Sequence, residues 1–311
     1  MALPLRHLFS QGPVLASLGG TAMAALRQRV APPALTRPST PGPMLAETIP
    51  PRPPELVRDY VRHVGGDPGL WKGTLPPHLF PQWGFPLAAR TLRDVPYPIA
   101  RVLNGGCRLE VNGPLPADRP LRVTARLEDI DDDGRRAVLH QRVTTGTDEQ
   151  PEAVVGHLYA IVPLGVPLGV PLGGGKGDKK DKRERKEPAR VPRDATELAY
   201  WRIPADAGLA FALLTGDFNP VHWIRPYARA FGFKSTILHG FSTMARAIEG
   251  LGRALYAGDT RRITLLDCRF TRPLVLPARV GLYASGREVY VGDAPDGPAY
   301  LVGSFQGSPT P

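Results

Sequence analysis

Residues 214–222 read Leu-Thr-Gly-Asp-Phe-Asn-Pro-Val-His, and residues 238–240 read Leu-His-Gly. Asp217 and His222 stand five residues apart, with an Asn-Pro pair between them. The proline fixes its own φ angle and disfavours helical backbone in the residue before it, so we expect a turn here. Such a turn can aim a carboxylate and an imidazole at one point, where they can hold a water molecule and move protons near neutral pH.

The glycine at position 240 follows His239 and precedes residues 241–256, whose apolar spacing predicts a helix. A helix N-terminus carries partial positive charge, and glycine has no side chain to cover its backbone N–H. The sequence therefore predicts that the Gly240 N–H can stabilise a developing oxyanion.

This region resembles the signature of the MaoC-like dehydratases, which include the (R)-specific enoyl-CoA hydratases, or hydratase 2. The resemblance rests on Gly-Asp-Phe-Asn-Pro-Val-His at 216–222, on Tyr-Ala and Ala-Phe-Gly-Phe within 227–233, and on Ile-Leu-His-Gly-Phe at 237–241. It is close over residues 195–307 and loose over the first half of the chain. The family's fold is the hot-dog fold, in which an antiparallel sheet wraps one long helix.

The resemblance implies that Asp217 and His222 activate a water molecule and that the Gly240 N–H binds a thioester oxygen. Asn219 and Pro220 are then expected to fix the turn.

His239 and Phe241 are candidates to line the site, and Lys234 and Arg225 are candidates to bind carrier phosphates. In some short relatives a serine stands about eight residues beyond the glycine, whereas this chain has Ile248.

Each of these residues also has an ordinary structural explanation. Aspartate is favoured at helix caps and turns, which would account for Asp217 without chemistry. His222 alone fits a partly buried structural histidine, and Phe241 and Met244 fit core positions of the helix.

The two halves of the chain repeat one order of elements. Each shows a helix followed by strands: a helix at 79–92 with strands at 99–111, 121–130, 136–145 and 153–162, then a helix at 238–255 with strands at 262–270, 279–285, 288–291 and 299–305. A faint repeat aligns residues 63–68 with 213–218, but the first copy has Lys72 in the place of His222. We predict an α+β double hot-dog: two antiparallel sheets, each wrapped around a long helix, packed as a pseudo-dimer.

The domain boundaries follow composition. Residues 1–54 read as a Pro/Ala/Arg-rich tail and residues 55–162 as a degenerate hot-dog domain. Residues 163–193, Gly/Pro-rich and then charged, read as a disordered linker. Residues 194–311 read as the catalytic MaoC-like domain.

The formal charge of +10 is concentrated outside the predicted domains. Residues 1–46 carry four arginines and no acid, and residues 176–193 carry nine Lys/Arg against four Asp/Glu, which together account for nine of the ten charges. A nucleic-acid partner is therefore not expected.

Only two cysteines are present, Cys107 and Cys268, which fits a reducing, cytoplasmic setting. A secretory or organellar leader stays an alternative for the arginine-bearing start, although its apolar run is thin. With no run of 18 apolar residues, no membrane span is expected.

The leading hypothesis is a hydro-lyase that converts trans-2-enoyl-CoA to (R)-3-hydroxyacyl-CoA. One alternative is a 3-hydroxyacyl-[acyl-carrier-protein] dehydratase of fatty-acid or polyketide synthesis. The other is a non-catalytic hot-dog subunit that binds acyl thioesters. The partner is thus an acyl-CoA or acyl-carrier-protein thioester, and a homodimer is an option. The histidines lack metal-ligand spacing, so no metal is expected. The mechanism that the resemblance implies needs no cofactor.

Overall fold

The computed structural model describes residues 3–7, 38–99, 102–164 and 188–308. Most of the predicted tail and linker lies outside these ranges. Among the described residues, no helix combines the length and the apolar character needed to cross a membrane.

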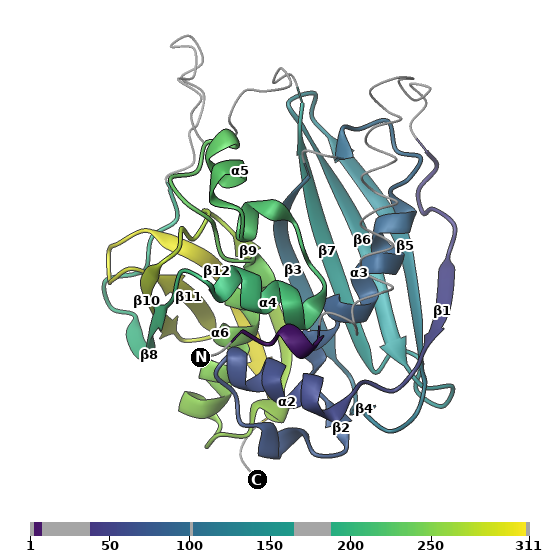
Figure 1. The fold of residues 1–311 in the computed structure, drawn as a ribbon, viewed down its shortest axis with the longest axis horizontal. Coiled ribbons are helices and arrows are strands. Elements are labelled where there is room, and N and C mark those ends of the chain that lie inside the picture. Colours follow the sequence, from purple (N-terminus) through teal and green to yellow (C-terminus); the bar gives the residue numbers. More distant parts are fainter. Residues whose placement is uncertain (1–2, 8–37, 100–101, 165–187, 309–311) are drawn as a thin grey trace.

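One antiparallel sheet of ten strands runs through both halves of the chain (Figure 1). Its strand order is β1-β5-β6-β7-β3-β9-β12-β11-β10-β8. The first half contributes β1 (Leu45–Ile49), β3 (Leu103–Val111), β5 (Leu121–Asp132), β6 (Arg136–Gly146) and β7 (Val154–Pro163). The second half contributes β8 (Thr196–Ile203), β9 (Ile263–Phe270), β10 (Ala278–Ser285), β11 (Glu288–Gly292) and β12 (Ala299–Gly307). A separate pair joins β2 (Thr74–Leu75) to β4 (Leu115–Pro116).

The strand order reads the same from both ends when each strand is matched to its counterpart in the other half. β1 corresponds to β8, β5 to β10, β6 to β11, β7 to β12 and β3 to β9. The two halves join at the centre, where β3 pairs with β9 and Cys107 lies opposite Cys268. The sheet therefore has an approximate twofold axis at this seam.

Each half places one main helix against its own strands. α3 (Pro81–Thr91) packs on β1, β5 and β6, and α6 (Gly240–Leu255) packs on β8, β9, β11 and β12. The apolar face of α6 is buried through Phe241, Met244, Ile248 and Leu251, as its helical spacing predicts. These features confirm the predicted α+β double hot-dog.

Smaller elements connect these parts. They are α2 (Pro54–His63), α4 (Ala207–Thr215), α5 (Arg225–Ala230) and the 3-10 turns η2 (Pro68–Trp71), η3 (Pro77–Leu79), η5 (Pro220–His222) and η6 (Thr260–Arg262). α2 and α4, from opposite halves, contact each other.

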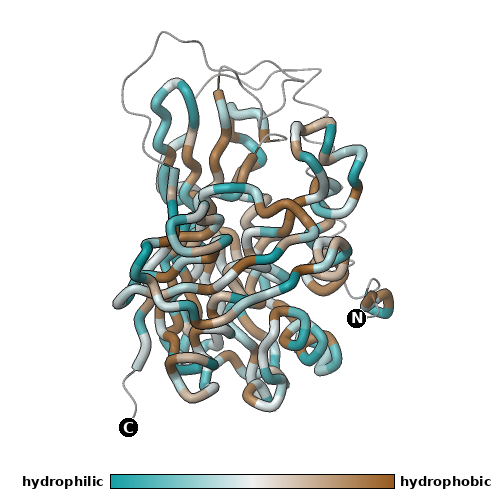
Figure 2. The backbone as a smooth tube through the Cα atoms, turned by 90° about the vertical axis from the view of Figure 1, so that its left-hand side faces the viewer, coloured by the Kyte–Doolittle hydropathy of each residue, from teal (hydrophilic) through white to brown (hydrophobic). Residues whose placement is uncertain are grey.

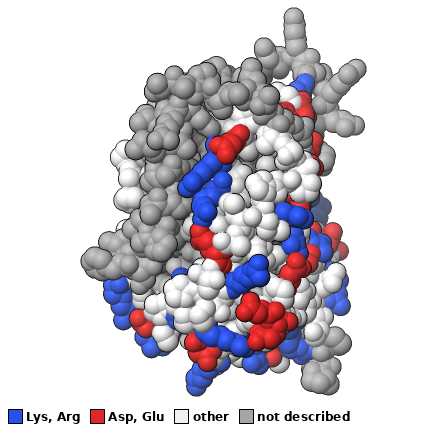
Figure 3. All heavy atoms as spheres, turned by 90° about the vertical axis from the view of Figure 1, so that its right-hand side faces the viewer, with Lys and Arg blue, Asp and Glu red and all other residues white. Residues whose placement is uncertain are grey.

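The main hydrophobic core is continuous across the seam. It includes Leu87 of α3, Met244 of α6, and Cys107 and Cys268 of the central strands. Hydrophobic segments concentrate in the inner strands and helices, and hydrophilic residues dominate the outer loops (Figure 2). On the described surface beside β1 and α3, basic and acidic side chains are interspersed (Figure 3).

The structure corrects the extent of the predicted tail. Residues 45–49, assigned to the tail, form the edge strand β1, which pairs with β5. Leu45 and Ile49 pack against the core. The prolines of this region flank the strand without interrupting it, and an edge strand pairs on one side only, so its pattern is weak. β8 and α2 were also not predicted.

Candidate active site

A left-handed glycine sets the start of the site. α4 ends at Thr215, and Gly216 follows with φ 82° as its C-cap, donating its N–H to Ala212 O at 2.7 Å. This conformation favours glycine and ends the helix directly before Asp217. The Asn219 side chain then accepts a hydrogen bond from Val221 N at 3.2 Å and caps η5. The predicted turn is therefore present, with Asp217 and His222 at its two ends.

His222 has a defined tautomer. Its Nδ1 lies 2.9 Å from the backbone oxygen of Ile237. A carbonyl oxygen can only accept, so Nδ1 carries the proton and Nε2 keeps a free lone pair. Burial lowers the pKa of His222 below its ordinary value, and the nearby Asp217 charge opposes that shift. His222 is therefore held as a neutral imidazole with Nε2 able to accept a proton.

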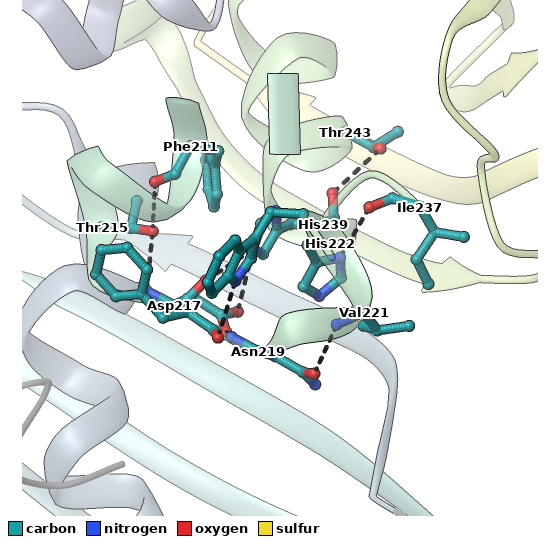
Figure 4. A network of polar contacts seen from close by, with 11 residues as sticks. Phe211, Thr215, Asp217, Asn219, Val221, His222, Ile237, His239 and Thr243 are labelled. Atoms are coloured by element: carbon teal, nitrogen blue, oxygen red, sulfur yellow. Dashed lines mark hydrogen bonds and ion pairs between the residues drawn. The ribbon is translucent and has the colours of Figure 1, made fainter. Parts of the chain in front are cut away.

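His239 is the third member of the cluster (Figure 4). Its Nε2 lies 3.0 Å from the backbone oxygen of Asp217 and 3.8 Å from Oδ2 of the same residue. Its ring stacks on the ring of His222, with centroids 3.6 Å apart. Burial lowers the pKa of His239 to about 3, so this ring is neutral as well. The sequence predicts His239 only as a candidate to line the site. Its position directly before the helix is the feature that points to this contact.

Gly240 is the first residue of α6. The N–H groups of a first helical turn have no intrahelical partner and point out of the helix end. A Cβ at position 240 would lie 2.7 Å from the Phe270 ring, so close packing also favours glycine here. The corresponding first residue of α3 is Pro81, which has no N–H to donate.

The other predicted residues are Phe241, Arg225 and Lys234, which make no hydrogen bond or ion pair with this cluster within the described residues. Phe241 is buried in an aromatic group, with ring centroids 5.9 Å from Phe80 and 4.8 Å from Phe85. Arg225, at the start of α5, and Lys234 are exposed. Neither has an ion pair within the described part of the chain.

The fold brings three potential metal ligands together although their spacing in the sequence does not predict a metal site. Asp217, His222 and His239 each offer a ligand atom within 4.8 Å of the others, so the fold gathers residues that the sequence separates. However, His222 and His239 each use one nitrogen on a backbone carbonyl, and the second nitrogen of His239 is buried. The stacked rings suit proton transfer at His222 Nε2 better than shared coordination of an ion.

A cavity of about 340 Å³ lies elsewhere and includes none of these three residues. It is lined by Trp71, His78, Leu109 and Ile248 among others. We place the candidate active site at the acid–base cluster because volume alone supplies no chemistry.

Comparisons with known proteins identify relatives of this chain. A family model described as a MaoC like domain matches residues 180–294. The 3-hydroxyacyl-thioester dehydratase Y of Mycobacterium tuberculosis is 30% identical over 178 residues, covering 56% of this chain and 58% of that protein. The enoyl-CoA hydratase ChsH3 of the same organism is 29% identical over 172 residues, covering 55% and 56%. The chain thus spans little more than half the length of these relatives.

A solved structure extends the likeness to the whole fold. A conserved hypothetical protein of Mycobacterium tuberculosis, described as a double hot-dog fold, matches with a TM-score of 0.55 at 13% identity. The match covers 86% of this chain and 96% of that one. At this identity, the likeness concerns the fold alone.

Proposed function

Because the chain contains a MaoC-like dehydratase domain in a double hot-dog fold, we propose that it is a hydro-lyase acting on the 2,3 bond of an enoyl thioester. In the hydration direction it converts trans-2-enoyl-CoA to (R)-3-hydroxyacyl-CoA. The observation that carries this proposal is the meeting of Asp217, His222 and His239 beside the N-terminus of α6.

The water is activated by the pair at the ends of the turn. His222 Nε2 accepts a proton from a water molecule that the Asp217 carboxylate orients, and the water oxygen bonds to the β-carbon. The electrons of the double bond move toward the thioester carbonyl. The proton held by His222 then goes to the α-carbon, so one water molecule is added and both groups return to their starting states.

The thioester oxygen gains negative charge during this step. The N–H of Gly240, at the positive end of the 16-residue helix α6, is the proposed donor to that oxygen. Fixed donors of this kind are usually a large part of catalysis because they need no reorganisation as charge develops.

His239 acts as a positioning residue in this scheme. Its hydrogen bond fixes the backbone of Asp217, and its ring supports the ring of His222. Both parts of the acid–base pair are therefore held by one buried side chain.

The carrier is proposed to be coenzyme A. Arg225 and Lys234 are exposed cations on the segment that carries His222, and phosphates bind to such groups. An acyl-carrier-protein thioester is the alternative carrier.

The deciding experiment is hydration of short trans-2-enoyl-CoA by the purified protein. The reaction is monitored through the loss of absorbance of the conjugated thioester. Chiral analysis should give the (R)-3-hydroxyacyl product, and chain length is then varied. Turnover only with the carrier-protein thioester would select the dehydratase alternative. Binding without turnover of either substrate would select the non-catalytic alternative.

A further inference from the structure

The first half of the chain contains a counterpart of the active site that lacks its chemistry. α2 and α4 are related by the approximate twofold axis, and both are followed by a glycine with positive φ and an aspartate, which is Asp67 in the first half. Lys72 stands five residues beyond Asp67, where the second half has His222. Pro81 replaces Gly240 at the start of the main helix. The counterpart therefore has neither the imidazole nor the backbone donor.

The cavity of about 340 Å³ lies at this counterpart site. Its walls come from the segment after α2, from β3 and β4, and across the seam from α6, η6 and β9. They are largely apolar, with Leu75, Leu109, Leu115, Ile248 and Leu266 among them. Small-molecule pockets typically measure roughly 300–1,000 Å³, so the cavity is large enough for a ligand.

The polar groups on one side of the cavity are already paired. The buried Glu249 carboxylate accepts hydrogen bonds from Thr260 Oγ1 at 2.8 Å, His78 Nε2 at 3.0 Å and Trp71 Nε1 at 3.3 Å. The other ring nitrogen of His78 lies 3.0 Å from the Tyr60 hydroxyl. This network fixes the wall and leaves no free donor there for an anion.

Two basic residues border the cavity. Lys72 lines it and is exposed to solvent. It has no ion-pair partner in the part of the chain that the structure describes. Arg261 also lines the cavity, and Asp259 holds its guanidinium at 2.8 Å. An apolar interior behind a free cation suits an apolar chain with an anionic head group.

We propose that this cavity is a second ligand site, which binds an acyl chain and holds its anionic head group at Lys72. The head group is either the carboxylate of a fatty acid or the phosphates of an acyl-CoA. The site binds without hydrating, because it lacks counterparts of His222 and of the Gly240 N–H. The inference rests on the cavity and the repeat, independently of turnover at Asp217.

Calorimetric titration with saturated decanoyl-CoA tests this proposal, since that thioester has no double bond to hydrate. We expect two molecules to bind per chain. Ile248→Phe fills the cavity from α6 and should reduce the number to one. Leu255→Phe, an exposed position on the same helix, should still bind two. The proposal would be overturned if the parent protein bound one molecule of decanoyl-CoA per chain and Ile248→Phe still bound one.

A charge reversal keeps the test independent of packing. Lys72→Glu changes an exposed side chain and should weaken the second binding event about tenfold, as expected for loss of a charge-assisted contact. Arg62→Glu, exposed on α2 and outside the cavity, should leave it unchanged. Decanoate bound at the same site identifies a fatty acid as a sufficient ligand, and binding of decanoyl-CoA alone identifies the phosphates as the head group. No effect of Lys72→Glu on either ligand contradicts the proposed orientation.

Turnover separates this inference from the proposed function. A protein that binds one decanoyl-CoA, lost in Ile248→Phe, and hydrates no enoyl thioester would support the second site and reject the hydratase proposal. Full turnover together with a single bound decanoyl-CoA that Ile248→Phe does not affect would support the hydratase proposal and reject the second site.

Discussion

The ring of His239 stacks on the ring of His222, with centroids 3.6 Å apart and planes inclined by 24°. The two rings come from different elements, since His222 ends η5 and His239 caps α6. Bringing them together also places the Asp217 backbone 3.0 Å from His239 Nε2. The contact therefore couples the proposed acid–base pair to the helix whose N-terminus carries the proposed oxyanion donor, Gly240.

The titration of His222 should depend on Asp217. Burial lowers the pKa of His222, and the Asp217 charge raises it. Asp217→Asn removes the charge that favours the imidazolium, so the pKa of His222 should fall further. NMR titration of the His222 ring protons in both proteins measures this shift. An unchanged or higher pKa in Asp217→Asn would show that the two side chains do not interact as the structure places them.

The free energy of unfolding should fall as the solution becomes acidic. Burial lowers the pKa of His63 and of His239 to about 3, well below the ordinary 6.5. Between these values the unfolded chain binds more protons than the folded one, so stability is full above about pH 6.5 and is lost toward pH 3. Each group contributes a slope of up to about 1.4 kcal/mol per pH unit.

Urea unfolding at a series of pH values measures this slope. His63→Asn removes one titrating group and should reduce the slope by up to about 1.4 kcal/mol per pH unit within that window. Arg62→Gln, the exposed neighbour, should preserve it. A slope that does not respond to His63→Asn would mean that His63 is not buried as a neutral ring.

The sequence predicts the sheet and the main helices because their patterns are local. The strand predicted at 136–145 is β6 (Arg136–Gly146), and the alternation of buried and half-buried residues along most of it follows from one face packing on the core. The helix predicted at 238–255 is α6, and its apolar spacing identifies its buried face. The edge strand β1 lacks such a pattern because its two end residues are only half-buried and the three between them are exposed.

The candidate site is predicted only in part because its geometry is not local. Asp217 and His222 share one turn, so their meeting follows from the Asn-Pro spacing. The contacts of His239 depend on the path of the chain between His222 and α6, which no spacing rule encodes. The cavity is even harder to predict from the sequence than the contacts of His239. Two of the residues that line it, Ile248 and Leu109, come from opposite halves of the chain and meet only across the seam.

Two replacements of Gly240 distinguish the contribution of its backbone N–H from the effect of its small size. Gly240→Pro removes the proposed oxyanion donor, and proline is well tolerated at the first position of a helix. The preceding His239 has φ −60° and ψ 135°, which suits a residue before proline. Gly240→Ala crowds the Phe270 ring in the same way but keeps the N–H. We expect Gly240→Pro to lose a further ~10²–10³-fold in kcat relative to Gly240→Ala. Equal kcat in the two variants would require a different donor.

The acid–base pair should behave as one unit. Asp217→Asn keeps the size of the side chain but removes its charge, and His222→Ala removes the proposed proton acceptor. Each single change should lower kcat by ~10²–10⁴-fold, the usual contribution of general acid–base catalysis. Because both residues act on one water molecule, the double variant should be little slower than either single variant. KM should change much less, since other groups hold the acyl chain and its carrier.

Asp67→Asn is the matched control for Asp217→Asn, because it changes the corresponding aspartate of the first half. Asp67 is exposed and accepts a hydrogen bond from Gly69 N at 2.8 Å, which caps η2. With Lys72 in the place of the histidine, its loss should leave kcat within a few-fold of the parent protein. Melting temperatures of all variants confirm that folded proteins are compared. Near-normal turnover in folded Asp217→Asn would exclude Asp217 from the chemistry, and a large loss in Asp67→Asn would place the chemistry in the first half.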